Sequence, residues 1–184
     1  MNTDEARKGA IVHRPLSGPS GVCTYDDTMA LTTRRVTTVE TQSDIHFEFN
    51  VPVSGDLAYT AISKVKDWWI IDTEGKTSAL GDSFTVHFTR DQDFVRFTIT
   101  AARPGHKDTW HAQDCFLHWF KDKTEWNGID VTFDIVPATE ASMIKMVHRG
   151  LTPDVECYDI CNAGWESHMT SLNKLITDGV GTPQ

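Results

Sequence analysis

The strongest constraint on the fold is a long amphipathic segment between residues 152 and 179. Mostly apolar side chains recur there three and four residues apart, as on one face of a helix. These positions are Tyr158, Cys161, Trp165, His168, Met169, Leu172, Leu175 and Ile176. Thr152 is a suitable N-cap, Pro153 suits the first helical position, and Gly179 suits the position after the last turn. The pattern predicts a helix of about 25 residues, roughly 38 Å long.

The chain before this segment alternates between apolar and polar residues, which is typical of half-buried strands. The predicted strands cover residues 45–51, 83–89, 94–102, 108–120, 128–136 and 142–148. Short polar turns separate many of them, which favours an antiparallel meander. Residues 54–70 instead show helical spacing, with Ser54 as a candidate cap. We expect one or two short helices there, ending near Trp68 and Trp69.

Together these elements predict a single α+β domain over residues 44–184. A sheet with one apolar face needs a cover, and only the last helix is long enough to supply it. We therefore expect a helix-grip fold: a curved antiparallel sheet wrapped around a long C-terminal helix, with short helices after the first strand. A gap between sheet and helix is the natural place for a ligand cavity.

Residues 1–43 differ in composition from the rest of the chain. Apolar residues are sparse, and residues 17–21 are rich in glycine and serine. Such a segment has little apolar surface to bury, so we expect a flexible N-terminal arm. No apolar run approaches the roughly 20 residues of a membrane span, and no signal-peptide pattern is evident. These features predict a cytoplasmic protein without membrane insertion.

Charge and cysteine spacing argue against several classes of ligand. The formal net charge is −9 at pH 7, and an acidic domain repels nucleic-acid phosphates. Cys157 and Cys161 would share a helix face, but no further ligands follow at zinc spacing. Asp114 and His118 share a strand face without a third ligand, because His111 falls on the other face. We therefore expect no metal, no cofactor and no nucleic acid.

A series of short motifs resembles the START/SRPBCC superfamily, specifically the branch named after the activator of a heat-shock-protein ATPase. The motifs are Glu125-Trp126-Asn127-Gly128, Val131-x-Phe133-x-Ile135, His148-Arg149-Gly150-Leu151, Glu156-Cys157 with Cys161, Gly164-Trp165, Ser171-Leu172 and the glycine-rich residues 179–183. The resemblance spans roughly residues 44–183. It implies a helix-grip fold with an internal cavity, in a family that includes lipid carriers, polyketide cyclases and aromatases.

The candidate ligand site lies between the predicted sheet and the last helix. We expect its lining to be Trp69, Phe133, Ile144, Met146, His148, Cys161, Trp165 and Met169. His148 would share the inward face of its strand with Ile144 and Met146, where its ring could bind a ligand oxygen or act as a general base. A second interpretation stays open, in which His148 is a core residue hydrogen-bonded to the backbone or to the last helix.

Three functions fit these residues. The first is a module that binds a small apolar or amphipathic molecule in the cavity. The second is a cyclase-, aromatase- or hydrolase-like enzyme in which His148 or Asp114 moves a proton. The third is a co-chaperone-type protein with a protein partner on its outer surface. Because the sequence shows no activated nucleophile and no clear acid–base pair, we expect ligand binding rather than catalysis.

Overall fold

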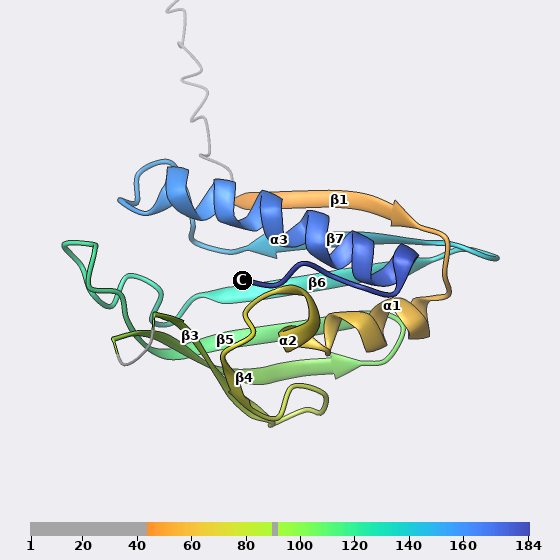
Figure 1. Cartoon of the computed structure of the whole chain (residues 1–184), viewed down its shortest axis with the longest axis horizontal. Helices are drawn as coiled ribbons and strands as arrows, with labels where there is room; N and C mark the ends of the chain where they lie inside the picture. Colours follow the sequence, from red (N-terminus) through yellow and green to blue (C-terminus); the bar gives the residue numbers. More distant parts are fainter. Residues whose placement is uncertain (1–43, 90–91) are drawn as a thin grey trace, which may run out of the picture. The chain divides into compact units, whose positions relative to one another are not determined.

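The computed structural model describes residues 44–89 and 92–184, which form one sheet and three helices (Figure 1). The strands are β1 (Ile45–Val51), β2 (Thr73–Gly75), β3 (Ser83–Thr89), β4 (Asp93–Arg103), β5 (Lys107–Phe116), β6 (Asp130–Pro137) and β7 (Ser142–His148). The helices are α1 (Gly55–Ile62), α2 (Val65–Trp68) and α3 (Tyr158–Asp178). The arm expected over residues 1–43 lies outside the described residues. Within them, no helix is long and apolar enough to cross a bilayer.

All seven strands form one antiparallel sheet in the order β1-β7-β6-β5-β4-β3-β2. From β2 to β7 each strand pairs with the next along the chain, so this part of the sheet is a meander. The strand β1 pairs with β7 at one edge. The sheet is curved and α3 lies across one of its faces (Figure 1). The predicted helix-grip architecture is therefore confirmed.

The alternation of residue types places one face of the sheet in the core. In the β6–β7 pair, Phe133 lies opposite Met146 and Ile135 lies opposite Ile144. All four side chains are buried, whereas Lys145 between two of them is only partly buried. Because side chains alternate between the faces of a strand, this register directs one apolar row of each strand toward α3.

The two short helices between β1 and β2 bring two tryptophans into the core. Ser54 caps α1 as predicted, since its Oγ accepts a hydrogen bond from the Leu57 N–H at 3.4 Å. Helix α2 ends at Trp68, whose indole N–H donates to the Ile62 carbonyl oxygen at 3.0 Å. Trp68 and the following Trp69 are both buried.

Helix α3 begins later than predicted. Its first residue is Tyr158, and the preceding residues from Pro153 form turns. The prediction of Thr152 and Pro153 as the helix start was therefore wrong. The reason is a contact from far along the chain: the Glu125 carboxylate accepts the Glu156 backbone N–H at 2.9 Å and ties this segment to the loop before β6.

The end of α3 is as predicted, and the chain after it returns toward α2. Gly179 has a φ of 79°, the left-handed conformation that glycine adopts readily after a helix. Beyond it, the Thr182 N–H donates to the Ser171 hydroxyl at 2.7 Å. The Gln184 N–H then donates to the Trp69 carbonyl oxygen at 3.0 Å. These bonds place Gln184 beside the corner that follows α2.

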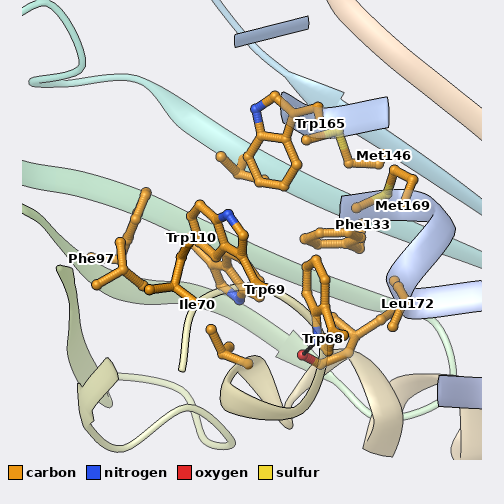
Figure 2. Close-up of a cluster of buried hydrophobic side chains, with 14 of the residues drawn as sticks. Trp68, Trp69, Ile70, Phe97, Trp110, Phe133, Met146, Trp165, Met169 and Leu172 are labelled. Atoms are coloured by element: carbon orange, nitrogen blue, oxygen red, sulfur yellow. Dashed lines mark hydrogen bonds between the residues drawn. The ribbon is translucent and has the colours of Figure 1, made fainter. Parts of the chain in front are cut away.

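Aromatic side chains fill the centre of the core, as Figure 2 shows. Trp69 stacks on Trp110 with ring centroids 5.7 Å apart, and Phe133 lies 4.9 Å from Trp110. Met146 and Leu172, which belong to β7 and α3, have no exposed surface. The space between the middle of the sheet and α3 is therefore occupied by packed side chains.

Candidate ligand pocket

A pocket of about 160 Å³ lies beside the first half of α3. Its aromatic lining residues are Trp69, Phe88, Trp119, Phe120, Trp126 and Trp165. Its other lining residues are Leu117, Ile160, Cys161, Gly164, His168 and Gln184. Trp119 is 42% exposed and Ile160 is 67% exposed. The pocket is therefore open to solvent on the side where these two residues lie.

Helix α3 supplies one wall of the pocket. Cys161, Gly164, Trp165 and His168 follow one another at intervals of three, one and three residues, so they lie on one helix face. Because Gly164 has no side chain, it leaves free space on this face of the helix. Among the described residues, a Cβ atom at Gly164 would meet only the Nε2 atom of His168, at 3.9 Å.

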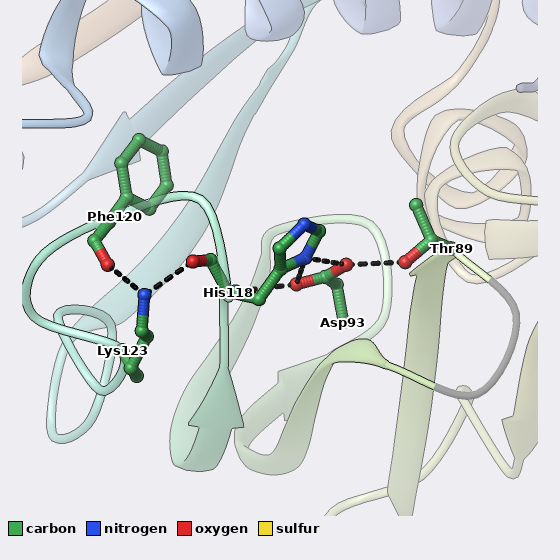
Figure 3. A network of polar contacts seen from close by, with 5 residues as sticks. All are labelled: Thr89, Asp93, His118, Phe120 and Lys123. Carbon is green, nitrogen blue, oxygen red and sulfur yellow. Dashed lines mark hydrogen bonds and ion pairs between the residues drawn. The ribbon is translucent and has the colours of Figure 1, made fainter.

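The facing wall is the loop over residues 117–126, and Asp93 anchors its start (Figure 3). Asp93 is fully buried and accepts the His118 backbone N–H at 2.6 Å and the Thr89 hydroxyl. The His118 ring Nδ1 lies 2.8 Å and 2.7 Å from the two carboxylate oxygens. Burial acts to raise the pKa of Asp93, but these hydrogen bonds outweigh it and lower the pKa. The anchor is therefore an ionised carboxylate.

The Lys123 side chain stabilises the same loop by hydrogen bonds to backbone carbonyl oxygens within it (Figure 3). Its ammonium group donates to the carbonyl oxygens of His118 and Phe120, the latter at 2.6 Å. The Lys123 carbonyl oxygen in turn accepts the Leu117 N–H at 2.9 Å. β5 therefore ends at Phe116, and the prediction that this strand continues to residue 120 was wrong.

His148 does not line the pocket, but it forms a hydrogen bond to Trp165, which does. It is completely buried, and its Nδ1 accepts a hydrogen bond from the Trp165 indole N–H at 2.8 Å. Because an indole nitrogen only donates, Nδ1 carries no proton and Nε2 carries the ring proton. Burial lowers the pKa of His148 to about 3, so the ring stays neutral. His148 therefore orients Trp165, whose ring lines the pocket.

His168 is the titratable imidazole that lines the pocket itself. It is 7% exposed, and its ring centroid lies 6.1 Å from that of Trp69 and 6.0 Å from that of Trp165. No hydrogen bond joins its ring to any other group within residues 44–89 and 92–184. Burial lowers the pKa of His168 to about 4. At neutral pH it is an uncharged ring with one donor and one acceptor.

The two cysteines at the start of α3 take different places. Cys161 lines the pocket, whereas Cys157 is fully buried and accepts the Trp126 indole N–H at 3.5 Å. The neighbouring Cys161 thiol and burial both raise the pKa of Cys157, so its thiol stays protonated. The described residues contain no cluster of three or more histidine, cysteine or acidic side chains that could hold a metal ion.

No protein-family model and no curated protein matches the chain. Solved structures do match. The Aha1 dimer from Colwellia psychrerythraea is 18% identical, with 75% of this chain and 98% of that chain covered and a TM-score of 0.60. MLL2253 from Mesorhizobium loti is 17% identical, with 71% and 94% covered and a TM-score of 0.58. DynU16, from the dynemicin biosynthetic locus, is 16% identical, with 74% and 48% covered and a TM-score of 0.57.

The fold is of the START/SRPBCC type. At these identities the likeness concerns the fold alone. The resemblance seen in the sequence motifs is thus confirmed at the level of architecture, and activity has to be argued from the pocket.

Within this START/SRPBCC-type fold, the structure brings three of the eight predicted site residues to the pocket: Trp69, Cys161 and Trp165. The other five do not line it, and each is at most 4% exposed: Phe133, Ile144, Met146, His148 and Met169. The reason is that the indoles of Trp68 and Trp110 occupy the middle of the core, where Trp110 lies against Phe133. The open space lies instead at the edge, under the loop over residues 117–126.

Sequence reasoning did not select several lining residues. Gly164 and His168 belong to the helix face that the spacing of Cys161 and Trp165 defines, so the spacing could have identified them. The aromatic residues Trp119 and Phe120 were assigned to a strand. Nothing in their local sequence indicates the distant contact to Asp93 that turns this segment into the wall of a pocket.

Proposed function

We propose that the protein binds a small, mostly apolar molecule in the pocket between α3 and the loop over residues 117–126. The observation that carries this proposal is a wall built largely from aromatic side chains around about 160 Å³ of open space. A cavity of about 150 Å³ lined by apolar side chains is large enough to bind benzene. Aromatic walls favour a guest with an apolar, flat surface.

The titration of the two buried histidines favours binding over catalysis. A general base works best when its pKa lies near the working pH. Burial lowers the pKa of His168 to about 4 and that of His148 to about 3, so both are weak bases at neutral pH. His148 is also shielded by Trp165. A cyclase- or hydrolase-like reaction would therefore need a proton acceptor other than these two rings.

The test is to fill the pocket without disturbing the fold. Gly164→Leu places a side chain in the open space, where a Cβ atom has no closer neighbour than His168 Nε2 at 3.9 Å. The matched control is Ala163→Leu, because Ala163 is the adjacent position of α3 and is exposed. Leucine favours a helix over glycine by about 1 kcal/mol, so Gly164→Leu should retain or raise the melting temperature.

Binding is measured with fluorobenzene, whose fluorine resonance broadens when the molecule exchanges with a protein site. We expect broadening with the wild-type chain and with Ala163→Leu, and loss of broadening with Gly164→Leu. No broadening with the folded wild-type chain would contradict the proposal, and so would equal broadening with both variants and the wild-type chain. A co-chaperone-type role would then be the better interpretation, because it uses an outer surface.

A further inference from the structure

We infer that the pocket selects a neutral, single-ring aromatic molecule that carries a hydroxyl group, and that His168 recognises this hydroxyl by a hydrogen bond. This inference rests on the proposed function, since it assigns a ligand class to the same pocket. It makes His168 the residue that determines specificity.

The position of His168 points to a polar group on the ligand. The side chain is more than nine-tenths buried and lines the pocket. Its Nε2 edge lies 3.9 Å from the Cβ position that Gly164 leaves empty. No other group in the described part of the chain bonds to the ring. The ring nitrogens are not among the buried atoms without a partner, so they keep accessible surface and a polar group of a ligand in the pocket can reach them.

A hydroxyl group fits this environment better than a carbonyl. A neutral imidazole presents one N–H donor and one acceptor nitrogen, and no protein contact fixes which nitrogen carries the proton of His168. A carbonyl oxygen can only accept. A hydroxyl can donate to the bare nitrogen or accept from the N–H, so it pairs with either tautomer.

The charge and the volume of the pocket restrict the class of ligand further. None of the side chains that line the pocket is charged at neutral pH, because His168 has its pKa lowered to about 4. An ion would lose its hydration there without gaining a counter-charge from any of these side chains. A volume of about 160 Å³ accommodates one benzene-sized ring. Phenols meet both conditions, because they ionise only near pH 10 and are neutral at pH 7.

The experiment compares 4-fluorophenol with 4-fluorotoluene by fluorine resonance titration at pH 7, for the wild-type chain and for His168→Phe. Phenylalanine keeps a flat aromatic ring at this position and removes both hydrogen-bonding atoms. We expect the ratio of the 4-fluorophenol affinity to the 4-fluorotoluene affinity to fall about tenfold in His168→Phe, as expected when one buried hydrogen bond is lost. An unchanged ratio would overturn the inference.

A second measurement on the wild-type chain removes any dependence on the folding of the variant. With ¹⁵N-labelled histidine, 4-fluorophenol should shift the ring nitrogen resonances of His168, and 4-fluorotoluene should leave them nearly unchanged. Equal shifts with both compounds would contradict the hydroxyl contact. Tighter binding of benzyltrimethylammonium than of 4-fluorophenol would also overturn the inference, since it would assign the aromatic wall to a cation.

Failure of the inference and failure of the proposed function give different results. If neither 4-fluorophenol nor 4-fluorotoluene binds, the pocket is not a ligand site and both proposals fall. If both bind and the affinity ratio does not depend on His168, the pocket binds apolar molecules and only the hydroxyl specificity is wrong.

Discussion

Replacing Asp108 with asparagine should stabilise the protein at neutral and alkaline pH. Asp108 lies near the start of β5, opposite Phe133 of β6, and has no exposed surface. Neither carboxylate oxygen has a hydrogen-bond partner among the described residues. The Trp110 indole N–H is near enough to favour the ionised form, yet it too lacks a hydrogen-bond partner there. A buried carboxylate in such surroundings is costly to ionise.

The size of the stabilisation expected from Asp108→Asn follows from the pKa of the Asp108 carboxyl group. Burial raises the pKa of Asp108 from 3.8 to about 7, against smaller opposite influences from Trp110 and the Thr109 N–H. An acid with a higher pKa in the folded state binds its proton more tightly when folded. The contribution of Asp108 to the free energy of unfolding therefore falls as pH rises from about 4 to about 7 and then levels off. At about 1.4 kcal/mol per pH unit, the loss amounts to at most about 4 kcal/mol at pH 8.

The assay is urea unfolding of the wild-type chain and Asp108→Asn between pH 4 and pH 8. His148 and His168 have lowered pKa values, so the contribution of these two rings to stability falls in both proteins as pH drops below about 6.5. The difference between the two proteins removes this shared term. We expect that difference to be small near pH 4 and to grow toward pH 8 in favour of asparagine. A difference that does not change with pH would refute the argument.

Two further substitutions test the fold and the pocket wall. Leu172→Asp places a charge at a position of α3 that has no exposed surface. It should lower the free energy of unfolding by several kcal/mol. A cooperative urea transition with the wild-type midpoint would contradict the helix-grip packing. Asp93→Asn weakens the anchor of the loop over residues 117–126. We expect a loss of about 1–3 kcal/mol and weaker fluorobenzene binding. The control Asp130→Asn disrupts the half-buried pair with His111, which is more exposed than Asp93, and should cost less than about 1 kcal/mol. Equal losses would show that Asp93 does not anchor the loop more strongly than an ordinary ion pair.

Local sequence patterns were sufficient to predict most of the architecture. The period-two alternation predicted the strands that became β1, β3, β4, β6 and β7 within two residues at each end. Ser54 and Gly179 marked helix ends because capping depends on neighbouring residues only. The start of α3 and the end of β5 were missed for the same physical reason. At each, a carboxylate binds a backbone N–H from 31 and 25 residues away, respectively, and local spacing carries no sign of such a bond.

The pocket was predicted less well than the fold, and the histidines show why. His148 shares the buried face of its strand with Ile144 and Met146, and His168 falls on the apolar stripe of the last helix. Both patterns indicate burial, and both side chains are buried. What distinguishes the two rings is the arrangement around them: Trp165 covers His148, whereas the loop over residues 117–126 leaves space beside His168. That space depends on long-range contacts, which local spacing does not reveal.

Polar side chains without a hydrogen-bond partner therefore occur in two different settings in this protein: the Asp108 carboxylate oxygens are cut off from solvent, whereas the His168 ring nitrogens are not. Asp108 and His168 both lack a hydrogen-bond partner within residues 44–89 and 92–184. Asp108 lies near the beginning of β5 and does not line the pocket, so only the loss of its charge can relieve its cost. His168 adjoins a pocket that opens to solvent, so a water molecule or a ligand can supply the missing bond. If this distinction is right, Asp108→Asn should raise stability and leave the affinity for fluorobenzene unchanged. The reason is that Asp108 lies in the core and does not contact the pocket, whereas His168 lines the pocket.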